Sequence, residues 1–270
     1  MKKNKALAWL LSGCIILIPV TLAAQEMSPD TIWNQTDMNG YKQGYWKKYY
    51  DTGVLRYKGF FSDNRPLGHL TRYYESGGKM ADIEYPADGI TSYATLYYQN
   101  GSLAAEGKFI NQEKDSLWKY YSYYSNSLSY EETYASGKKH GVSKVYYDNG
   151  QVAQAIMWKN DLKHGPWKQF YEDSSVRLVS QHENDEMEGK YQVFNNDGTL
   201  IIDGAYHQDQ KVNTWKYYLD DGSEDFELVY IDGVLQNEDV MSKRLEEFMD
   251  ELEKNSGTIP EPDLENFIPQ

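Results

Sequence analysis

Residues 44–61 read Gly-Tyr-Trp-Lys-Lys-Tyr-Tyr-Asp-Thr-Gly-Val-Leu-Arg-Tyr-Lys-Gly-Phe-Phe, and this stretch decides the fold. An aromatic run comes first, a short polar turn ending at Gly53 interrupts it, and a second run rich in aromatic and aliphatic residues follows. Aromatic and β-branched side chains favour strands, and a glycine-containing turn between two such runs predicts a β-hairpin.

The same pattern recurs along the chain in eight copies, with a period of 24 residues. With Gly44 counted as position 1, the copies begin at Gly44, Gly68, Ser92, Ser116, Gly141, Gly165, Gly189 and Asn213. Only the interval that starts at Ser116 is 25 residues long, and that copy offers Ser125-Asn126 where others have a turn glycine. A period this regular predicts a linear array of small units rather than one compact core.

The predicted fold is therefore all-β: an elongated, single-sheet antiparallel array of β-hairpins over residues 44–236, followed by one short α-helix. Eight hairpins would supply about 16 strands and a sheet on the order of 80 Å long. The hairpin turns recur as Asn100-Gly101, Asn149-Gly150, Asp197-Gly198 and Asp221-Gly222. These dipeptides tolerate the positive φ angles that tight hairpin turns require.

The segments before and after the repeats are expected to cover the two ends of the sheet. Residues 25–43, with Trp33 and Tyr41, lead into the first hairpin and are expected to cap it. Residues 237–255 are expected to form an amphipathic capping helix on the last sheet edge, with partner docking as the alternative. Its apolar stripe consists of Met241, Leu245, Phe248 and Leu252. Residues 256–270 have three prolines and are expected to form a flexible acidic tail.

The first 24 residues have the pattern of a secretory signal peptide. Lysines at the start precede a mostly apolar run, and the small residues Ala23 and Ala24 mark the expected cleavage site. A lipoprotein signal acylated at Cys14 is the first alternative, although the apolar run continues past that cysteine, and an uncleaved anchor is the second. We expect an exported protein, periplasmic, at the cell envelope or secreted.

The composition excludes several functional classes. Cys14 is the only cysteine, so a chain cleaved after Ala24 would have no disulfide, thiolate metal site or cysteine nucleophile. Removal of three lysines with that segment would change the net charge from −14 to −17. Such an acidic chain is not expected to bind nucleic acid or anionic lipid surfaces. No later stretch is apolar enough to cross a bilayer.

Side chains alternate across a strand, so the repeat predicts two different faces. Position 3 is rich in tryptophan, and positions 7 and 18 are mostly aromatic; we expect these rings to pack on one another in place of a core. Position 4 is mainly lysine, and its copies are Lys47, Thr71, Thr95, Lys119, Lys144, Lys168, Gln192 and Lys216. Position 6 shares the lysine face and is aromatic in every copy: Tyr49, Tyr73, Tyr97, Tyr121, Tyr146, Phe170, Phe194 and Tyr218.

No residues with a catalytic or metal-binding pattern stand out. His140 and His164 occupy the same phase of the repeat and should lie roughly 10 Å apart, too far to ligate one ion. The acidic cluster around Asp221 lacks EF-hand spacing, and no nucleophile elbow or phosphate loop occurs. We therefore expect no catalytic residues, no cofactor and no metal, and a protein that is not an enzyme.

The residues Gly44, Trp46, Tyr49, Tyr50 and Gly53 resemble the variant form of the MORN repeat. The resemblance recurs at Gly141, Tyr146, Tyr147 and Gly150, and it covers about residues 44–236. It implies a continuous antiparallel sheet that binds proteins or, in some members, lipids. Bacterial proteins with tandem copies are often described as antitoxin-like, a role that an exported chain could not perform on a cytoplasmic toxin.

The sequence thus predicts a non-catalytic, exported scaffold that binds an unidentified protein partner, with the cell envelope as a candidate place of binding. Exposed tyrosines beside lysines suit protein interfaces, although lysine stems that merely cover the rings would give the same pattern. The candidate partner-binding residues are Tyr49, Tyr73, Tyr97, Tyr121, Tyr146, Phe170 and Tyr218. The alternative is a cell-surface glycan-binding module in which the rings stack on successive sugars, and lipid binding ranks third.

Overall fold

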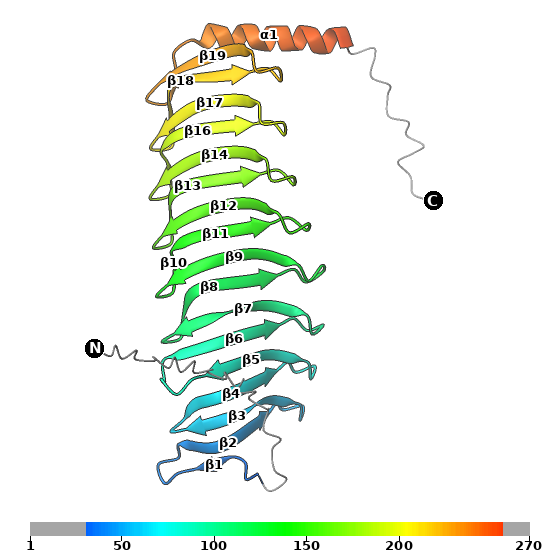
Figure 1. Ribbon diagram of the computed structural model, residues 1–270, viewed down its shortest axis with the longest axis vertical. Helices are drawn as coiled ribbons and strands as arrows, with labels where there is room; N and C mark the ends of the chain where they lie inside the picture. Colours follow the sequence, from blue (N-terminus) through cyan, green and yellow to red (C-terminus); the bar gives the residue numbers. More distant parts are fainter. Residues whose placement is uncertain (1–30, 256–270) are drawn as a thin grey trace, which may run out of the picture. The chain divides into compact units, whose positions relative to one another are not determined.

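The computed structural model describes residues 31–255. The predicted signal peptide, the first residues of the predicted N-terminal cap and the predicted acidic tail lie outside these residues. The described elements form one open antiparallel sheet with a single C-terminal helix, which confirms the predicted fold class (Figure 1).

The sheet is a meander in which successive long strands pair with one another along the chain, and the two-residue strands extend this pairing at the joints and at the ends. Its first half comprises β1 Gln35–Thr36, β2 Lys42–Tyr49, β3 Leu55–Ser62, β4 Arg65–Tyr73, β5 Lys79–Tyr85, β6 Thr91–Tyr97, β7 Leu103–Ile110, β8 Glu113–Tyr121, β9 Leu128–Ala135 and β10 Lys138–Lys139. The second half comprises β11 Gly141–Tyr146, β12 Val152–Lys159, β13 Leu162–Phe170, β14 Val176–Glu183, β15 Glu186–Met187, β16 Gly189–Phe194, β17 Leu200–His207, β18 Gln210–Tyr218, β19 Glu224–Ile231 and β20 Val234–Leu235.

The turn inside each hairpin contains one left-handed residue, at or near the predicted turn glycine. In the first hairpin the amide of Gly53 donates to the carbonyl of Tyr50, and Gly53 has a φ of 82°. The residues before the turn glycines, such as Asn100 and Asn149, are not among those with positive φ. The loop is therefore a three-residue turn closed by one left-handed residue, and the register shifts beside it. The inserted residue of the fourth repeat enlarges this loop, where Asn126 has a φ of 57°.

The two-residue turns with two positive φ angles occur instead at the joints between hairpins. Asp63-Asn64, Asn160-Asp161 and Asn184-Asp185 all have this conformation. It is that of a type I′ turn, whose twist matches the twist of paired strands and which favours Asn, Asp and Gly. One joint departs from the rule: a longer loop around Asp88 and Gly89 connects β5 to β6. Hairpin turns thus line one side of the sheet and joints the other (Figure 1).

The first residue of the repeat is also left-handed in seven of the eight copies, the exception being Ser92. Gly44, Gly68 and Gly165 have φ values of 70°, 67° and 100°, and the non-glycine copies Ser116 and Asn213 have 59° and 62°. A residue without a Cβ adopts this conformation at the lowest cost, which explains the recurrent glycine at position 1.

The core lies on one face of the sheet, where the position 3 side chains pack. Trp118 and Trp215 are 1% and 2% exposed. Gly107 and Gly204 lie beneath these two rings, and a Cβ on either glycine would overlap the indole. Ala94 and Ala105 are buried beside Trp118, with Phe109, Tyr120 and Tyr134 packed around them.

The two ends of the sheet are covered to different degrees. At the first edge β1 pairs with β2, and Trp33 contacts Tyr45 with 6.0 Å between ring centroids. At the other end α1 (Glu238–Asn255) follows β20, and Arg244 binds Asp225 of β19 at 2.8 Å. The expected burial of the helix stripe against the sheet is not found. Leu245 and Phe248 remain 60% and 53% exposed, because the helix is attached mainly through its arginine.

Candidate functional site

The sheet presents two chemically different faces. We call the side that carries positions 2, 4 and 6 the lysine–tyrosine face, and the side that carries positions 3, 5 and 18 the tryptophan face. Contacts confirm the division: Glu106 receives both an ion pair from Lys119, at 3.6 Å, and a hydrogen bond from Tyr121, at 2.9 Å. Position 6 therefore shares a face with the lysine row.

The seven candidate residues at position 6 form a row along the sheet, one in each of seven hairpins, and do not gather at a single point. Tyr49 is exposed, and the other members of the row are half-buried. Three consecutive members donate hydrogen bonds to carboxylates of the preceding hairpin: Tyr97 to Asp82, Tyr121 to Glu106 and Tyr146 to Glu131. Burial and the bond to Glu106 raise the pKa of Tyr121 to about 12, and burial and Glu131 raise the pKa of Tyr146. The hydroxyls of Tyr121 and Tyr146 therefore stay protonated, and their hydrogen bonds fix all three hydroxyls in orientation.

An exposed apolar row, which the sequence reasoning missed, lies beside them. Position 2 contributes Tyr93, Leu117 and Val142, which are 51%, 43% and 39% exposed. Tyr93, Leu117 and Lys119 line a hollow of about 440 Å³ between the third and fourth hairpins. The signal was present in the sequence, because position 2 contains Tyr45, Tyr93, Leu117 and Val142 where a solvated face would be polar. Apolar side chains exposed in a line are unusual for a surface that contacts only water.

The tryptophan face carries a second lysine row, two residues before position 1. Lys42, Lys114 and Lys211 each lie over aromatic rings, and the Nζ of Lys211 is 4.2 Å from the ring centroid of Trp215. Burial lowers the pKa of Lys211. Such cation–π contacts contribute on the order of 1 kcal/mol each. The sequence signal for this row was a lysine two residues before position 1, ahead of Gly44, Ser116 and Asn213.

Several buried polar atoms on this face have no partner among the described residues. They gather in the fifth and sixth repeats: Ser143 Oγ, Trp158 Nε1, His164 Nδ1, Trp167 Nε1, Ser180 Oγ and His182 Nδ1. His182 is 5% exposed and lies 5.5 Å from Trp167 between ring centroids. Burial and the neighbouring Lys163 lower the pKa of His182, so its ring stays neutral near neutral pH.

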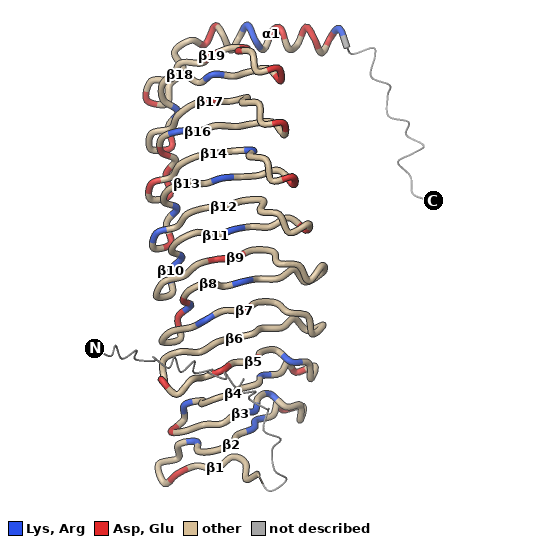
Figure 2. Tube along the Cα trace, in the orientation of Figure 1, with Lys and Arg blue, Asp and Glu red and all other residues tan. Residues whose placement is uncertain are grey.

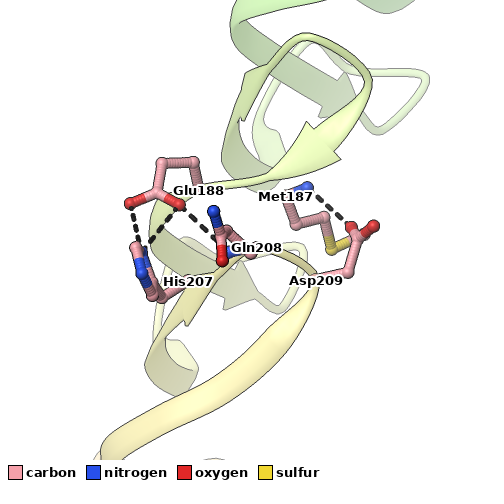
Figure 3. Close-up of polar contacts among 5 residues, drawn as sticks. All are labelled: Met187, Glu188, His207, Gln208 and Asp209. Carbon is pink, nitrogen blue, oxygen red and sulfur yellow. Dashed lines mark hydrogen bonds and ion pairs between the residues drawn. The ribbon is translucent and has the colours of Figure 1, made fainter. Parts of the chain in front are cut away.

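The joints are connected to one another by side-chain contacts. Figure 3 shows one case, in which the amide of Met187 donates to Asp209 Oδ1 at 2.7 Å. Glu188 lies beside it and contacts His207 Nδ1 at 3.1 Å. The Glu188 carboxylate raises the pKa of His207, and His207 in turn holds the pKa of Glu188 below its usual range.

Catalytic and metal-binding arrangements are not found in residues 31–255. No group of three or more His, Cys, Asp or Glu side chains there could hold a metal ion. The acids that the sequence placed in one cluster separate: Asp221 accepts bonds from Ser223, Glu224 pairs with Lys216, and Asp225 pairs with Arg244. No described helix is long and apolar enough to span a membrane.

Comparison with known proteins identifies the repeat. The family model described as the MORN repeat variant matches residues 42–63 and 139–160, which begin two residues before Gly44 and Gly141. No curated protein matches the chain. A solved structure entitled "Crystal Structure of TarM" aligns at 16% identity over 35% of this chain, with a TM-score of 0.27. The aligned part spans only 20% of that structure.

The two matched segments fall in the first and fifth hairpins, and both have a glycine at position 1, a glycine in the hairpin turn and the aromatic pair of positions 6 and 7. MORN repeats generally mediate interactions with proteins or lipids and are generally non-catalytic. Two of the eight hairpins are therefore similar to the MORN repeat variant by direct match to its family model.

Proposed function

We propose that this protein is a non-catalytic, exported scaffold that binds a protein partner through the lysine–tyrosine face. The observation that carries the proposal is the exposed apolar row of Tyr93, Leu117 and Val142 beside the fixed tyrosine row. Exposed aromatic and aliphatic side chains next to charged groups are typical of the centre and rim of a protein interface.

The geometry favours a partner that contacts several hairpins at the same time. Tyr97, Tyr121 and Tyr146 are held by carboxylates, so little side-chain entropy is lost when a partner packs on their rings. Between them, Lys119 and Glu106 form an exposed ion pair that a polar partner group can replace. Equivalent groups recur about every 10 Å, which suits an extended partner surface.

Site-specific photo-crosslinking in the source cells tests the proposal. A photoreactive amino acid at Tyr93 or Leu117 should give an adduct with one discrete protein, whereas the same amino acid at Tyr124 should not. Tyr124 is the matched control, because it is 92% exposed but lies in a hairpin turn away from the face. Equal adducts at all three sites, or none at Tyr93 and Leu117, would show that the face is not an interface.

A second arm separates protein recognition from glycan recognition. The triple variant Tyr49→Ser, Tyr73→Ser and Tyr218→Ser removes aromatic rings without removing any of the three tyrosine–carboxylate bonds. Loss of the protein adduct with an unchanged circular dichroism spectrum supports the protein interface. Binding of the wild type on a glycan array, abolished in the variant, would favour the glycan alternative instead.

Export is part of the proposal and rests on residues 1–24. Mass spectrometry of the protein from the envelope or culture medium should give an N-terminus at Gln25. Recovery of the intact chain from the cytoplasm, or of a chain that begins at an acylated Cys14, would contradict cleavage after Ala24.

A further inference from the structure

A pocket on the tryptophan face of the first two hairpins combines apolar and cationic side chains. Its volume is about 320 Å³. Phe61, Leu70 and Ile83 supply buried or half-buried apolar lining, and Lys48, Arg56 and Arg72 supply exposed cationic lining. The pocket lies on the opposite side of the sheet from the face proposed above for the protein partner.

The cations of this pocket have no carboxylate partner among residues 31–255. Lys48, Arg56 and Arg72 form no ion pair there, although they belong to a chain with 41 acidic and only 27 basic residues. Elsewhere on the same face the strand acids are paired, Glu132 with Lys139 and Asp225 with Arg244. Acidic residues gather mainly in the turns and in α1 (Figure 2). The pocket is therefore a local positive site on an acidic protein.

Strand register sets the spacing of these cations. Tyr57 pairs with Lys48 on one side and with Arg72 on the other, so the two cations flank its ring about 10 Å apart. Lys42 donates to the Tyr57 hydroxyl at 2.6 Å and fixes that ring. Arginine binds carboxylates in a bidentate geometry, so Arg56 and Arg72 favour a ligand with more than one carboxylate.

The chain itself contains a segment with this chemistry. Residues 261–267 read Glu-Pro-Asp-Leu-Glu-Asn-Phe. In an extended peptide the carboxylates of Glu261, Asp263 and Glu265 project to one side about 7 Å apart, and Phe267 projects to the same side. Three carboxylates followed by a ring match a row of cations beside an apolar surface.

The pocket and this segment cannot meet within one molecule. The 15 residues after α1 can span roughly 50 Å, whereas β4 and β19 are separated by roughly 60 Å of sheet. We propose that residues 256–270 of a second copy bind the pocket formed by Lys48, Arg56 and Arg72. Because donor and acceptor surfaces differ, the contact is heterologous, so it links copies head-to-tail into a ring or an open chain.

Two measurements test the proposal together. A fluorescein-labelled peptide of residues 256–270 should bind the purified protein in fluorescence anisotropy, and the weight-average mass in sedimentation velocity should rise with protein concentration. Addition of excess unlabelled peptide should return the protein to monomers, because it occupies the pocket and blocks the next copy.

Matched variants locate the site. Arg56→Gln with Arg72→Gln should weaken peptide binding about tenfold or more and abolish the concentration-dependent mass, since both bidentate contacts are lost. Arg177→Gln should change neither, although Arg177 occupies the same repeat position as Arg56 and likewise lies over a tyrosine ring. Lys48→Gln, at an exposed position, gives a second test if the double variant fails to fold.

Three outcomes would overturn the proposal. The first is that the wild type does not bind the peptide. The second is that the variant with both Arg56→Gln and Arg72→Gln still binds it. The third is that a scrambled peptide of the same composition binds equally well. The last would show that the pocket accepts any acidic peptide and does not select a second copy. None of these outcomes bears on the lysine–tyrosine face, so failure here is distinguishable from failure of the proposed function.

Discussion

At the scale of the residue, two glycines determine how closely two tryptophan rings pack on the sheet. Gly107 and Gly204 lie under Trp118 and Trp215, and the absence of a Cβ allows each indole to reach the backbone of the neighbouring hairpin. The Nε1 of Trp118 then donates to the carbonyl of Lys108 at 2.9 Å. A single-layer sheet has no second layer to bury its rings, so this close approach takes the place of a core.

Substitution of Gly107 tests this arrangement. Gly107→Ala should destabilise the protein by about 2–3 kcal/mol, because the new methyl group overlaps an indole that is fixed by a hydrogen bond. Gly78→Ala is the matched control: its Cβ would meet only Gln99 O, at 3.5 Å, and its stability should change by less than about 0.5 kcal/mol. Urea denaturation followed by tryptophan fluorescence measures both. Equal effects would refute the proposed packing.

The pair Glu188–His207 should make stability depend on pH. The pKa of His207 is raised above 6.5 in the folded state, so its contribution is present below pH 6.5 and is lost as the pH rises through the raised value. The pKa of Glu188 is lowered below 4.5, so its contribution is present above pH 4.5 and is lost as the pH falls through the lowered value. Both contributions are complete only between about pH 4.5 and 6.5.

Thermal denaturation across pH measures this window. The difference in Tm between the wild type and His207→Gln should be largest near pH 5.5 and should vanish above the folded pKa of His207. His140→Gln serves as the control, because His140 is an exposed joint histidine that forms no ion pair in residues 31–255. A pH profile shared by both variants would exclude the ion pair as the cause.

At the scale of the element, five of the eight hairpins are attached to the next by a tyrosine at position 7. Five such hydroxyls donate to the carbonyl of the following position 6: Tyr50, Tyr74, Tyr98, Tyr147 and Tyr171. The distances are 2.7–2.9 Å in every case. These bonds add to the strand pairing on the hairpin-turn side of the sheet.

Removal of one hydroxyl measures how much this hydrogen bond contributes to the free energy of unfolding. Tyr74→Phe should cost about 1 kcal/mol, since the carbonyl of Tyr97 loses its donor while the ring is kept. Tyr49→Phe should have an effect below about 0.5 kcal/mol, because the Tyr49 ring is exposed and its hydroxyl makes no hydrogen bond in the described part of the chain. Chemical denaturation distinguishes the two, and an unaffected Tyr74→Phe variant would show that the bond is not stabilising.

The hairpins and their number were predictable from the sequence, because period, alternation and turn glycines all indicated the same element. The turn that ends at Gly53 was predictable as well, whereas the conformation of the joints was not. At joints such as Asn160-Asp161 both residues have a positive φ and form a two-residue turn. Local sequence alone does not tell whether a polar dipeptide forms the turn within a hairpin or the joint between two hairpins.

The candidate site was predictable only in part. The position 6 row lies on the lysine face as expected, but bonds such as Tyr121 to Glu106 link residues 15 apart and depend on register between neighbouring hairpins. The exposed position 2 row and the cations around Tyr57 were missed, because they emerge only when several strands are placed side by side.

At the scale of the whole array, deletion of one 24-residue repeat should leave the fold of the remaining hairpins intact. Deletion of residues 141–164 joins Lys139-His140 to Gly165 and recreates the tripeptide Lys163-His164-Gly165. We expect a folded protein with unchanged β content and an array shorter by about 10 Å, which is two strand spacings. Small-angle scattering and circular dichroism check both.

Deletion of 12 residues within the same unit provides the contrast. It removes a single strand, so every later strand would reverse its direction and exchange its two faces. This variant should aggregate or unfold. If both deletions are tolerated equally, the 24-residue hairpin is not the cooperative unit.

The links between joints have a mechanical consequence. Tyrosine hydroxyls tie successive hairpins along one side, and contacts such as Met187 to Asp209 tie them along the other. A force applied along the array pulls neighbouring strands directly apart, so their hydrogen bonds break one after another rather than together. Under tension the protein should lengthen stepwise, one hairpin at a time, with each 24-residue unit releasing about 80 Å of chain.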